Sequence, residues 1–374
     1  MIRRMQIDNY RCFSNFEWAP GTFALLLGEN GAGKTSIFDV LESLRDIITK
    51  GFAVDEVFPA STLCRWREGH DGLQTFRLAV EGNGGEYEYC LQIQHELPKL
   101  LKNRISRETL FFNGQAVFEF DGKDIHLFSD DGSAGPVFPF DWSRSGFATV
   151  PERHDNTRLT WFRERVAAIS VFSPDPPAMH GVVRKAAAHS DRSMQNFAAW
   201  LFSSQSADFE IGGAVAASLR GTINGFSKHR FIKVGSSVHE LQIDFEFRDE
   251  SDKVTNRFEL TFDALSEGQR NLFALYSILH TAVRQGTTVC IDEPDNYMAL
   301  REIQPWLAAI QDAAEDHESQ VFLVSHHPEM INQLAAHSGT LFERDASGTT
   351  VCRKFVWKDM ENITPAELVA RGWE

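Results

Sequence analysis

Cysteines are few in this sequence, and they form no metal-binding or redox motif. Five cysteines are scattered over 374 residues, and no two stand at the spacing of a zinc-ligand pair or a Cys-x-x-Cys motif. An odd number of scattered cysteines does not make a disulfide framework, which indicates a reducing compartment. We therefore expect a cytoplasmic protein held together by its hydrophobic core, and a hydrophobic fraction of 43% is sufficient for one.

Long apolar stretches are missing as well. No run reaches the ~18 apolar residues that a membrane-spanning helix needs. The N-terminal stretch MIRRMQIDNY lacks the apolar core of a signal peptide. The sequence therefore predicts a soluble protein with no membrane partner.

An excess of positive charge is also absent. The formal net charge is −15 at pH 7, which argues against affinity for nucleic acid over the whole surface. One local basic stretch, KHRFIK at Lys228–Lys233, is the best candidate for a DNA contact. Short basic stretches are usually solvated surface, so DNA binding stays an open alternative.

The pattern of apolar residues predicts an α/β fold. Between Phe76 and Phe128 apolar and polar residues alternate, and Asn113-Gly114 is a hairpin turn signal, so we expect an antiparallel β-subdomain after the first helix. Residues 130–158 have a loop composition, and residues 190–235 have a helical pattern. Apolar strands alternate with helices at both ends of the chain, which predicts a parallel sheet with helices on its faces.

The stretch GENGAGKT, Gly28–Thr35, fits the pattern G-x-x-x-x-G-K-[ST] and stands between an apolar strand and a helix. Its glycines let backbone N–H groups surround phosphate oxygens, and the helix N-terminus adds its positive dipole end. Lys34 would reach the β- and γ-phosphates, and the Thr35 hydroxyl would bind Mg²⁺. The stretch predicts a nucleoside triphosphate site.

Two later strands end in polar residues that such a site needs. TVCIDEP ends in Asp292 and Glu293, which suit a metal-binding acid and a base for the attacking water. VFLVSHHP ends in His326 and His327, one of which could face the nucleotide at the strand's carboxyl end. A histidine at a strand end is by itself more often structural.

The stretch LSEGQR, Leu265–Arg270, allows two interpretations. Ser266 and Gln269 have the spacing of a helix N-cap and its capping box. The same stretch could instead bind a phosphate of a nucleotide held by a second subunit. The two interpretations are compatible, because a helix start presents N–H donors and a dipole to a phosphate. We expect another subunit's ATP to complete the cap.

Together, in this order, the four motifs resemble those of an ABC-type ATPase head. The segments IDNYRCFSNFEW and VFSPDPPAMHG are similar to the SMC, RecF and OLD branch of these proteins. The resemblance implies a P-loop NTPase of ABC type, with a mixed sheet flanked by helices, an antiparallel β-subdomain and a helical lobe. We expect lobe I at residues 1–172, a helical lobe II with a β-hairpin at 173–264, and the remaining ATPase core at 265–374.

The resemblance also implies ATP and Mg²⁺ as cofactors and a head-to-head homodimer, or a higher homo-oligomer, with ATP between the heads. The catalytic residues would be Lys34, Glu293 and His326, and the metal ligands would be Thr35 and Asp292. No glutamine matches the family's Q-loop; Ser173 and Asp175 stand there instead. The remaining nucleotide contacts would come from Gly28, Glu29, Asn30, Gly31, Ala32, Gly33, Lys34, Thr35 and Ser36 of one subunit and from Ser266, Gly268 and Gln269 of the other.

Three absences direct the functional hypothesis. The sequence has no heptads for a long coiled coil, it ends soon after its last motif, without room for an appended nuclease domain, and it has no second catalytic constellation. We expect an ATPase switch in a bacterial antiviral or toxin–antitoxin-like module. The switch would control a separately encoded effector, which we expect to be a nuclease. The alternatives are a RecF-like DNA clamp that uses Lys228, Arg230 and Lys233, and a scaffold that binds ATP with little turnover.

Overall fold

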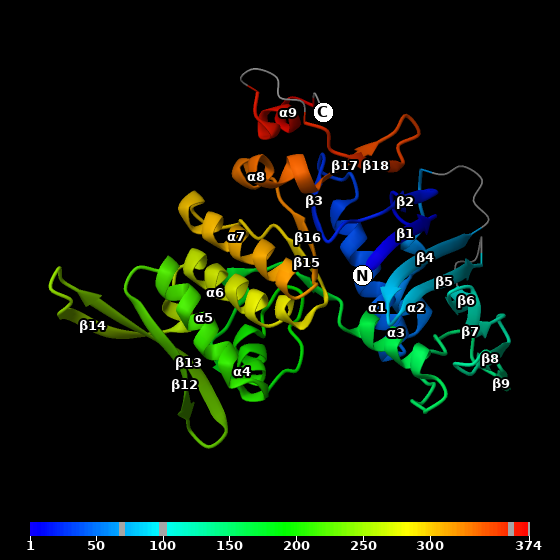
Figure 1. The fold of residues 1–374 in the computed structure, drawn as a ribbon, viewed down its shortest axis with the longest axis horizontal. Helices are drawn as coiled ribbons and strands as arrows, with labels where there is room; N and C mark the ends of the chain where they lie inside the picture. The colour runs from blue at the N-terminus through cyan, green and yellow to red at the C-terminus, as the bar shows by residue number, and fades with distance from the viewer. Residues whose placement is uncertain (67–71, 97–102, 358–362, 373–374) are drawn as a thin grey trace. The chain divides into compact units, whose positions relative to one another are not determined.

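The computed structural model describes residues 1–66, 72–96, 103–357 and 363–372. The chain forms two compact units, one of Met1–Ser170 with Ile331–Glu374 and the other of Val171–Met330 (Figure 1). The chain thus leaves the first unit after Ser170 and returns to it after Met330. The expected three-part division, with boundaries after residues 172 and 264, stays a prediction.

An antiparallel sheet makes up much of the first unit, and this confirms the predicted β-subdomain. Its strand order is β2-β1-β4-β5-β6-β7-β8-β9. The six residues of the last strand and the first two residues of a helix lie in the segment 130–158, where we expected only loop, so that expectation was wrong for these eight residues. The strands are β1 (Ile2–Asp8), β2 (Phe16–Trp18), β4 (Leu73–Gly82), β5 (Gly85–His95), β6 (Asn103–Phe112), β7 (Gln115–Phe120), β8 (Asp124–Phe128) and β9 (Ala134–Pro139).

Three further strands of the first unit belong to a second sheet. β17 (Gly339–Arg344) pairs in parallel with β3 (Phe23–Leu27) and antiparallel with β18 (Thr350–Lys354). The predicted helix after the glycine-rich loop is present as α1 (Lys34–Lys50). The other helices of this unit are α2 (Val54–Val57), α3 (Thr157–Ala167) and α9 (Pro365–Arg371).

Aromatic rings fill the core beneath the antiparallel sheet. The ring of Phe147 lies 4.4 Å from that of Phe118 and 5.6 Å from that of Tyr89, measured between centroids. Phe162 of α3 joins the cluster at 5.6 Å from Tyr89. Such rings bury large areas and favour tilted or edge contacts. The high phenylalanine count of the sequence therefore serves, in this unit, to join α3 to the sheet.

One carboxyl group lies inside this aromatic core. Glu108 is fully buried, and its Oε1 accepts hydrogen bonds of 2.7 Å from both the Tyr89 and the Ser145 hydroxyls. Burial raises the pKa of Glu108 to about 7. The carboxyl group is therefore protonated in the folded protein at pH values where it is ionised in the unfolded chain.

The variant Glu108→Gln should separate from the wild type as pH rises. Below about pH 4.5 the carboxyl is protonated in both states, so the two proteins should have similar free energies of unfolding. Between that pH and about 7 only the unfolded chain releases the proton, which destabilises the wild type by about 3 kcal/mol, a loss the amide does not suffer. Urea unfolding at pH 5 and pH 8 measures this, and a pH-independent difference would contradict it.

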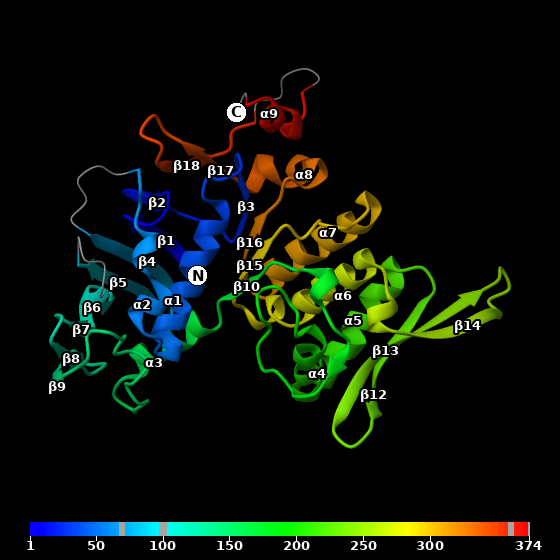
Figure 2. The ribbon, with the colours of Figure 1, turned by 180° about the vertical axis from the view of Figure 1, so that it is seen from behind.

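The second unit contains a pair of parallel strands and several helices. β15 (Thr288–Asp292) and β16 (Gln320–Val324) pair in parallel register, with β10 (Ser170–Phe172) beside β15. None of the helices that the structure describes is both long and apolar enough to cross a membrane. The helices are α4 (Phe197–Ala207), α5 (Phe209–Thr222), α6 (Glu267–His280), α7 (Leu300–Asp316) and α8 (Pro328–Ser338), which continues into the first unit (Figure 2).

A separate sheet in this unit corrects one expectation. The helical pattern expected for residues 190–235 is confirmed for α4 and α5 but wrong for β12 (Phe226–Val234). β12 pairs antiparallel along its length with β13 (Val238–Arg248), which also pairs with β14 (Val254–Thr261) and β11 (Val182–Val183). Pairing with a later strand decides the conformation of this stretch, and local sequence does not report it.

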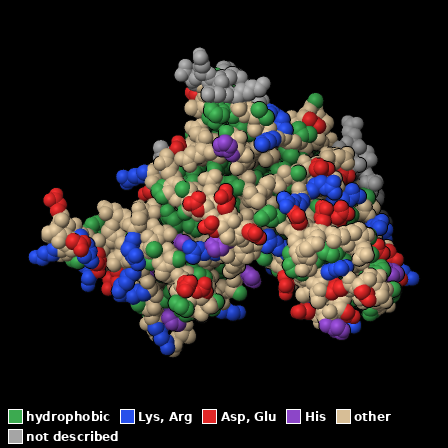
Figure 3. Space-filling model, in the orientation of Figure 1, with side chains coloured by type: hydrophobic (Ala, Val, Ile, Leu, Met, Phe, Trp, Pro, Cys, Tyr) green, Lys and Arg blue, Asp and Glu red, His purple; other side chains and the backbone are tan. Residues whose placement is uncertain are grey.

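Acidic neighbours neutralise most of the basic stretch on β12. Lys228 lies 3.6 Å from the Asp244 carboxylate, and Arg230 lies 3.0 Å from Asp244 and 2.6 Å from Glu259. Figure 3 shows blue and red side chains next to one another over these strands. Lys233 has no ion-pair partner among the residues that the structure describes. The stretch therefore offers little net positive charge to DNA.

Candidate nucleotide-binding site

The glycine-rich loop has a backbone that only glycine allows. Gly28, Gly31 and Gly33 have positive φ angles of 133°, 81° and 98°. A Cβ at position 28 would lie 2.1 Å from the Phe342 carbonyl oxygen of β17, and one at position 33 would lie 2.7 Å from the Cys12 sulfur. The sequence therefore uses glycine here both for the turn and for close packing.

The N-terminus of α1 is arranged to receive an anion. Its N-cap is Gly33, which has no side chain that could cap the helix, and the first turn carries no acidic residue. The first N–H groups of the helix are thus left for a ligand, which the helix dipole favours when it is negatively charged. Lys34 is buried, and its Nζ donates to the carbonyl oxygens of Gly28 (2.7 Å) and Glu29 (2.9 Å). Thr35 is exposed beside it.

A hollow of about 290 Å³ adjoins this loop. The Arg344 guanidinium lies 5.0 Å from the centroid of the Trp66 ring and donates a 2.7 Å hydrogen bond to the Gly31 carbonyl. Sequence reasoning missed both residues, because neither stands near a motif. The hollow is lined by Arg11, Cys12, Gly31, Ser36, Ser61, Leu63, Arg65, Trp66 and Arg344.

In the second unit, the two acids predicted from TVCIDEP lie at the end of β15. Asp292 is 9% exposed, and its carboxylate lies 3.8 Å from the Arg192 guanidinium. Glu293 is exposed, has a positive φ of 50°, and its N–H donates to the Val324 carbonyl at 2.8 Å. The Asn296 amide donates to the Glu293 carboxylate at 2.8 Å. Arg192 and Asn296 are further residues that the motifs did not reveal.

The two adjacent histidines have different surroundings. The His327 N–H donates to Ser325 Oγ at 2.9 Å, and its Nδ1 accepts from the Glu329 N–H at 3.2 Å, so His327 caps α8. His326 is exposed, and it has no hydrogen-bond partner among the residues that the structure describes. Both follow β16, whose carboxyl end lies beside that of β15. His326 thus remains the residue expected to face the nucleotide.

The stretch LSEGQR begins α6 with a complete capping box. Ser266 Oγ accepts from the Gln269 N–H at 3.3 Å, and Gln269 Oε1 accepts from the Ser266 N–H at 3.1 Å. The helix-start interpretation is confirmed. The Gln269 side chain closes the cap within one chain, and the ATP of another subunit that is expected to complete the cap would have to displace it. The phosphate-binding role of Ser266, Gly268 and Gln269 stays a prediction.

The segment that replaces the Q-loop is joined to the loop that carries Arg192. The Ser173 N–H donates to the Arg192 carbonyl at 2.7 Å, and the Asp175 N–H donates to the Ser193 carbonyl at 3.1 Å. The predicted site residues thus fall into two groups. Gly28–Ser36 belongs to the first unit, and Asp292, Glu293, His326 and the start of α6 belong to the second.

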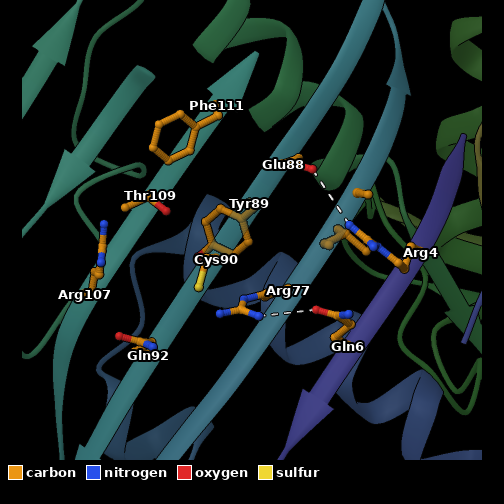
Figure 4. A pocket seen from close by; sticks show the side chains of 12 residues that line it. Arg4, Gln6, Arg77, Glu88, Tyr89, Cys90, Gln92, Arg107, Thr109 and Phe111 are labelled. Carbon is orange, nitrogen blue, oxygen red and sulfur yellow. Dashed lines mark hydrogen bonds and ion pairs between the residues drawn. The ribbon is translucent and has the colours of Figure 1, made fainter. Parts of the chain in front are cut away.

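A larger hollow of about 470 Å³ lies elsewhere in the first unit, on a face of the antiparallel sheet. Figure 4 shows Arg4, Arg77 and Arg107, which come from three strands, around it. The small side chains of Ala79 and Cys90 between these long ones leave the space open. None of the residues predicted to bind nucleotide lines this hollow.

Comparisons with known proteins bear on the family and the fold of this chain. A family model described as "AAA domain, putative AbiEii toxin, Type IV TA system" matches residues 23–332. The OLD nuclease of Thermus scotoductus is 27% identical over 106 residues, a match that covers 25% of this chain. The match covers only 20% of that nuclease's length.

Two solved structures of SMC heads share the fold. The SMC head domain from Thermotoga maritima aligns over 94% of this chain and 98% of its own, with 12% identity and a TM-score of 0.50. An Smc head bound to the C-winged helix domain of ScpA aligns over 94% and 97%, with 10% identity and a TM-score of 0.54. These likenesses confirm the predicted α/β P-loop NTPase fold. Since the family model spans most of the chain, the protein belongs to the family of AAA domains described as AbiEii-like, with the fold of an ABC/SMC-type ATPase head.

Proposed function

We propose that this protein is a dimeric switch that binds and hydrolyses ATP and controls a separately encoded effector. The observation that carries the proposal is the start of α1, where an uncapped helix N-terminus, a glycine loop and a buried lysine converge. These groups are all hydrogen-bond donors or positive dipoles, which suits the β- and γ-phosphates of a nucleotide. Membership of an AAA family supports the same conclusion.

The residues proposed as metal ligands are suited to Mg²⁺. The Thr35 hydroxyl and the Asp292 carboxylate are hard oxygen donors, and Mg²⁺ is usually held by one or two such groups together with phosphate oxygens and water. No group of three or more His, Cys, Asp or Glu side chains forms a metal cluster in the described parts of the chain. Such an ion would neutralise charge on the phosphates.

Glu293 is the proposed base. It is exposed at the end of a buried strand, so its carboxylate can reach a water molecule while its backbone is fixed by the bond to Val324. A carboxylate in that position would accept the proton of the attacking water as the bond to the γ-phosphate breaks, giving ADP and phosphate. Lys34 would stabilise the negative charge of the phosphates during this step.

The hollow beside the phosphate loop would take the nucleoside. Trp66 is 53% exposed, and its indole ring together with the Arg344 guanidinium offers flat surfaces on which a base can stack. Arg344 also binds the Gly31 carbonyl, so the proposed base site and the phosphate loop are joined by one side chain.

The proposed effector is supported by the comparisons, and the proposed second subunit is supported by the start of α6. The family description names a toxin–antitoxin system, and one relative is a nuclease of which this chain matches a small part. The proposed effector is a nuclease on a separate chain. For the dimer, Ser266 and Gly268 would bind the γ-phosphate held by the other subunit, with Gln269 released from the cap.

The dimer proposal predicts that ATP hydrolysis depends on protein concentration. If each site needs the start of α6 from a second subunit, phosphate release per subunit should rise with concentration and level off when dimers predominate. Sedimentation with ATP and Mg²⁺ should show monomers converting to dimers over the same range. Constant activity per subunit, together with a monomer in ATP, would contradict the dimer.

The same measurements decide between this switch and its alternatives. A scaffold would form the dimer in ATP but release almost no phosphate. A DNA clamp would bind DNA in an ATP-dependent way, although the ion pairs of Lys228 and Arg230 count against the basic stretch as its contact. Affinity purification from the cells that naturally produce the protein tests for the effector. Recovery of the protein without any bound partner would contradict the proposed effector.

A further inference from the structure

The loop that follows β15 is held in an uncommon conformation at both ends. Glu293 begins it with a φ of 50°, and Tyr297 ends it with a φ of 68°. Residues with a Cβ rarely adopt positive φ, and they keep it only where the surroundings fix it. The contacts of residues 293–297 therefore show what holds the proposed base in place.

The first contact comes from the side chain of Asn271 on α6. Asn271 is 1% exposed, and its Nδ2 donates to the carbonyl oxygens of Pro294 (2.9 Å) and Asn296 (2.7 Å). Two acceptors on one nitrogen fix the orientation of the amide. Its Oδ1 is buried, with no partner among the residues that the structure describes. A buried amide left half-satisfied is poorly explained as a stabilising group alone.

The second contact joins the first turn of α6 to the far end of the same loop. A Cβ on Gly268 would lie 2.6 Å from the Tyr297 carbonyl oxygen. The helix backbone and the loop backbone are therefore packed with no room for a side chain between them. With Asn271 one turn further along, α6 holds the loop at two points. A shift of the helix start must move the loop with it.

Inside the loop, Asn296 reaches back to Glu293. Its Nδ2 donates to Glu293 Oε2 at 2.8 Å, and both side chains are exposed. The Glu293 backbone is fixed separately by its bond to Val324, so Asn296 governs the direction of the carboxylate only. A chain of contacts thus runs from Ser266 through α6, Asn271 and the loop backbone to the Glu293 carboxylate.

We propose that Asn271 and Asn296 are positioning residues that connect the start of α6 to Glu293, so that a second subunit's nucleotide at Ser266 sets the orientation of the base. The inference rests on the proposed function, since it assumes that Glu293 is the base and that α6 contacts nucleotide across a dimer. Neither asparagine touches the nucleotide in this scheme. Both act through Glu293.

Variants of Asn296 test the last step of this connection. Because the side chain is exposed, Asn296→Ala should fold normally, and it should lower kcat roughly tenfold to a hundredfold with unchanged KM and dimer formation, as expected for a misplaced catalytic group. In Asn296→Asp the hydrogen-bond donor to Glu293 is replaced by a carboxylate that repels it, so this variant should also lower kcat with unchanged KM. An unchanged kcat in both variants would overturn the inference.

A double-mutant cycle tests the first step. If Ser266 acts through Asn271, then Asn271→Ala, Ser266→Ala and the double variant should have similar kcat values, since removing either end already breaks the connection. Multiplying effects in the double variant would overturn the connection. Asn224→Ala, an exposed asparagine on the same unit, is the matched control and should behave as the wild type. Thermal unfolding checks that Asn271→Ala folds. If that variant does not fold, the Asn296 variants test the inference.

Failure of the inference and failure of the proposed function are distinguishable. A wild-type protein that releases no phosphate and forms no dimer with ATP would refute the proposed function. A wild-type protein that does both, with Asn296 and Asn271 variants equal to it in kcat, would refute only the connection between α6 and the base.

Discussion

Glu293→Gln should lower phosphate release by about a thousandfold, the scale of a lost general base, while ATP binding persists. Glutamine keeps the size of the side chain and its acceptor for Asn296, but it cannot take a proton from water. The ATP-bound dimer should then outlive the mixing time and appear as a stable species in gel filtration. Single-turnover hydrolysis and sedimentation with ATP and Mg²⁺ measure the two effects.

The control for this variant is Glu315→Gln, an exposed acid at the end of α7. It changes the net charge by the same amount and should leave turnover unchanged. If Glu293→Gln hydrolyses ATP at the wild-type rate, another group is the base. If turnover is lost but no long-lived dimer forms, the hydrolysis and dimer parts of the proposal separate.

Lys34→Ala should weaken ATP binding about a hundredfold, because charge-assisted hydrogen bonds to phosphate are lost at a buried position. The ammonium group also binds the carbonyl oxygens of Gly28 and Glu29, so the variant removes a contact that holds the loop itself. Calorimetric titration with a slowly hydrolysed ATP analogue measures the affinity directly. Hydrolysis and dimer formation should fall in parallel at any fixed ATP concentration.

Lys50→Ala, at the other end of α1, is the matched control. Lys50 is exposed, and it contacts Asp46 one turn earlier and the Phe52 ring, so its loss should leave ATP affinity unchanged. Lys34→Arg should not restore binding, since the planar guanidinium is larger than the ammonium group and cannot replace it in a tight loop. Wild-type affinity in Lys34→Ala would show that the nucleotide does not bind at this loop.

Sequence motifs predicted the parts of the site that are contiguous in the chain. The phosphate loop, Asp292, Glu293 and the Ser266–Gln269 box each combine residues within one turn or one strand end, where spacing fixes geometry. The antiparallel subdomain was predictable for the same reason, because alternation is a local pattern.

The remaining parts come from residues that are distant in the chain. Arg344 contacts Gly31, which is 313 positions away in the chain, and Arg192 contacts Asp292, which is also distant in the chain. No pattern of neighbouring residues could therefore predict either contact. Asn271 was visible as a polar residue in an apolar helix, yet its two acceptors lie on a loop that sequence could not place. β12 was missed because its pairing with β13, rather than its own pattern, makes it a strand.

The closed capping box of α6 has a consequence for the strength of a dimer. A phosphate that binds at Ser266 must replace bonds that Gln269 already makes, so the number of hydrogen bonds changes little on association. What remains to favour the phosphate is its charge at the positive end of the helix, an interaction that salt weakens and that grows with each added negative charge. A dimer built in this way would discriminate between ATP and ADP by charge and would come apart readily after hydrolysis, with Gln269 as the internal competitor that resets it.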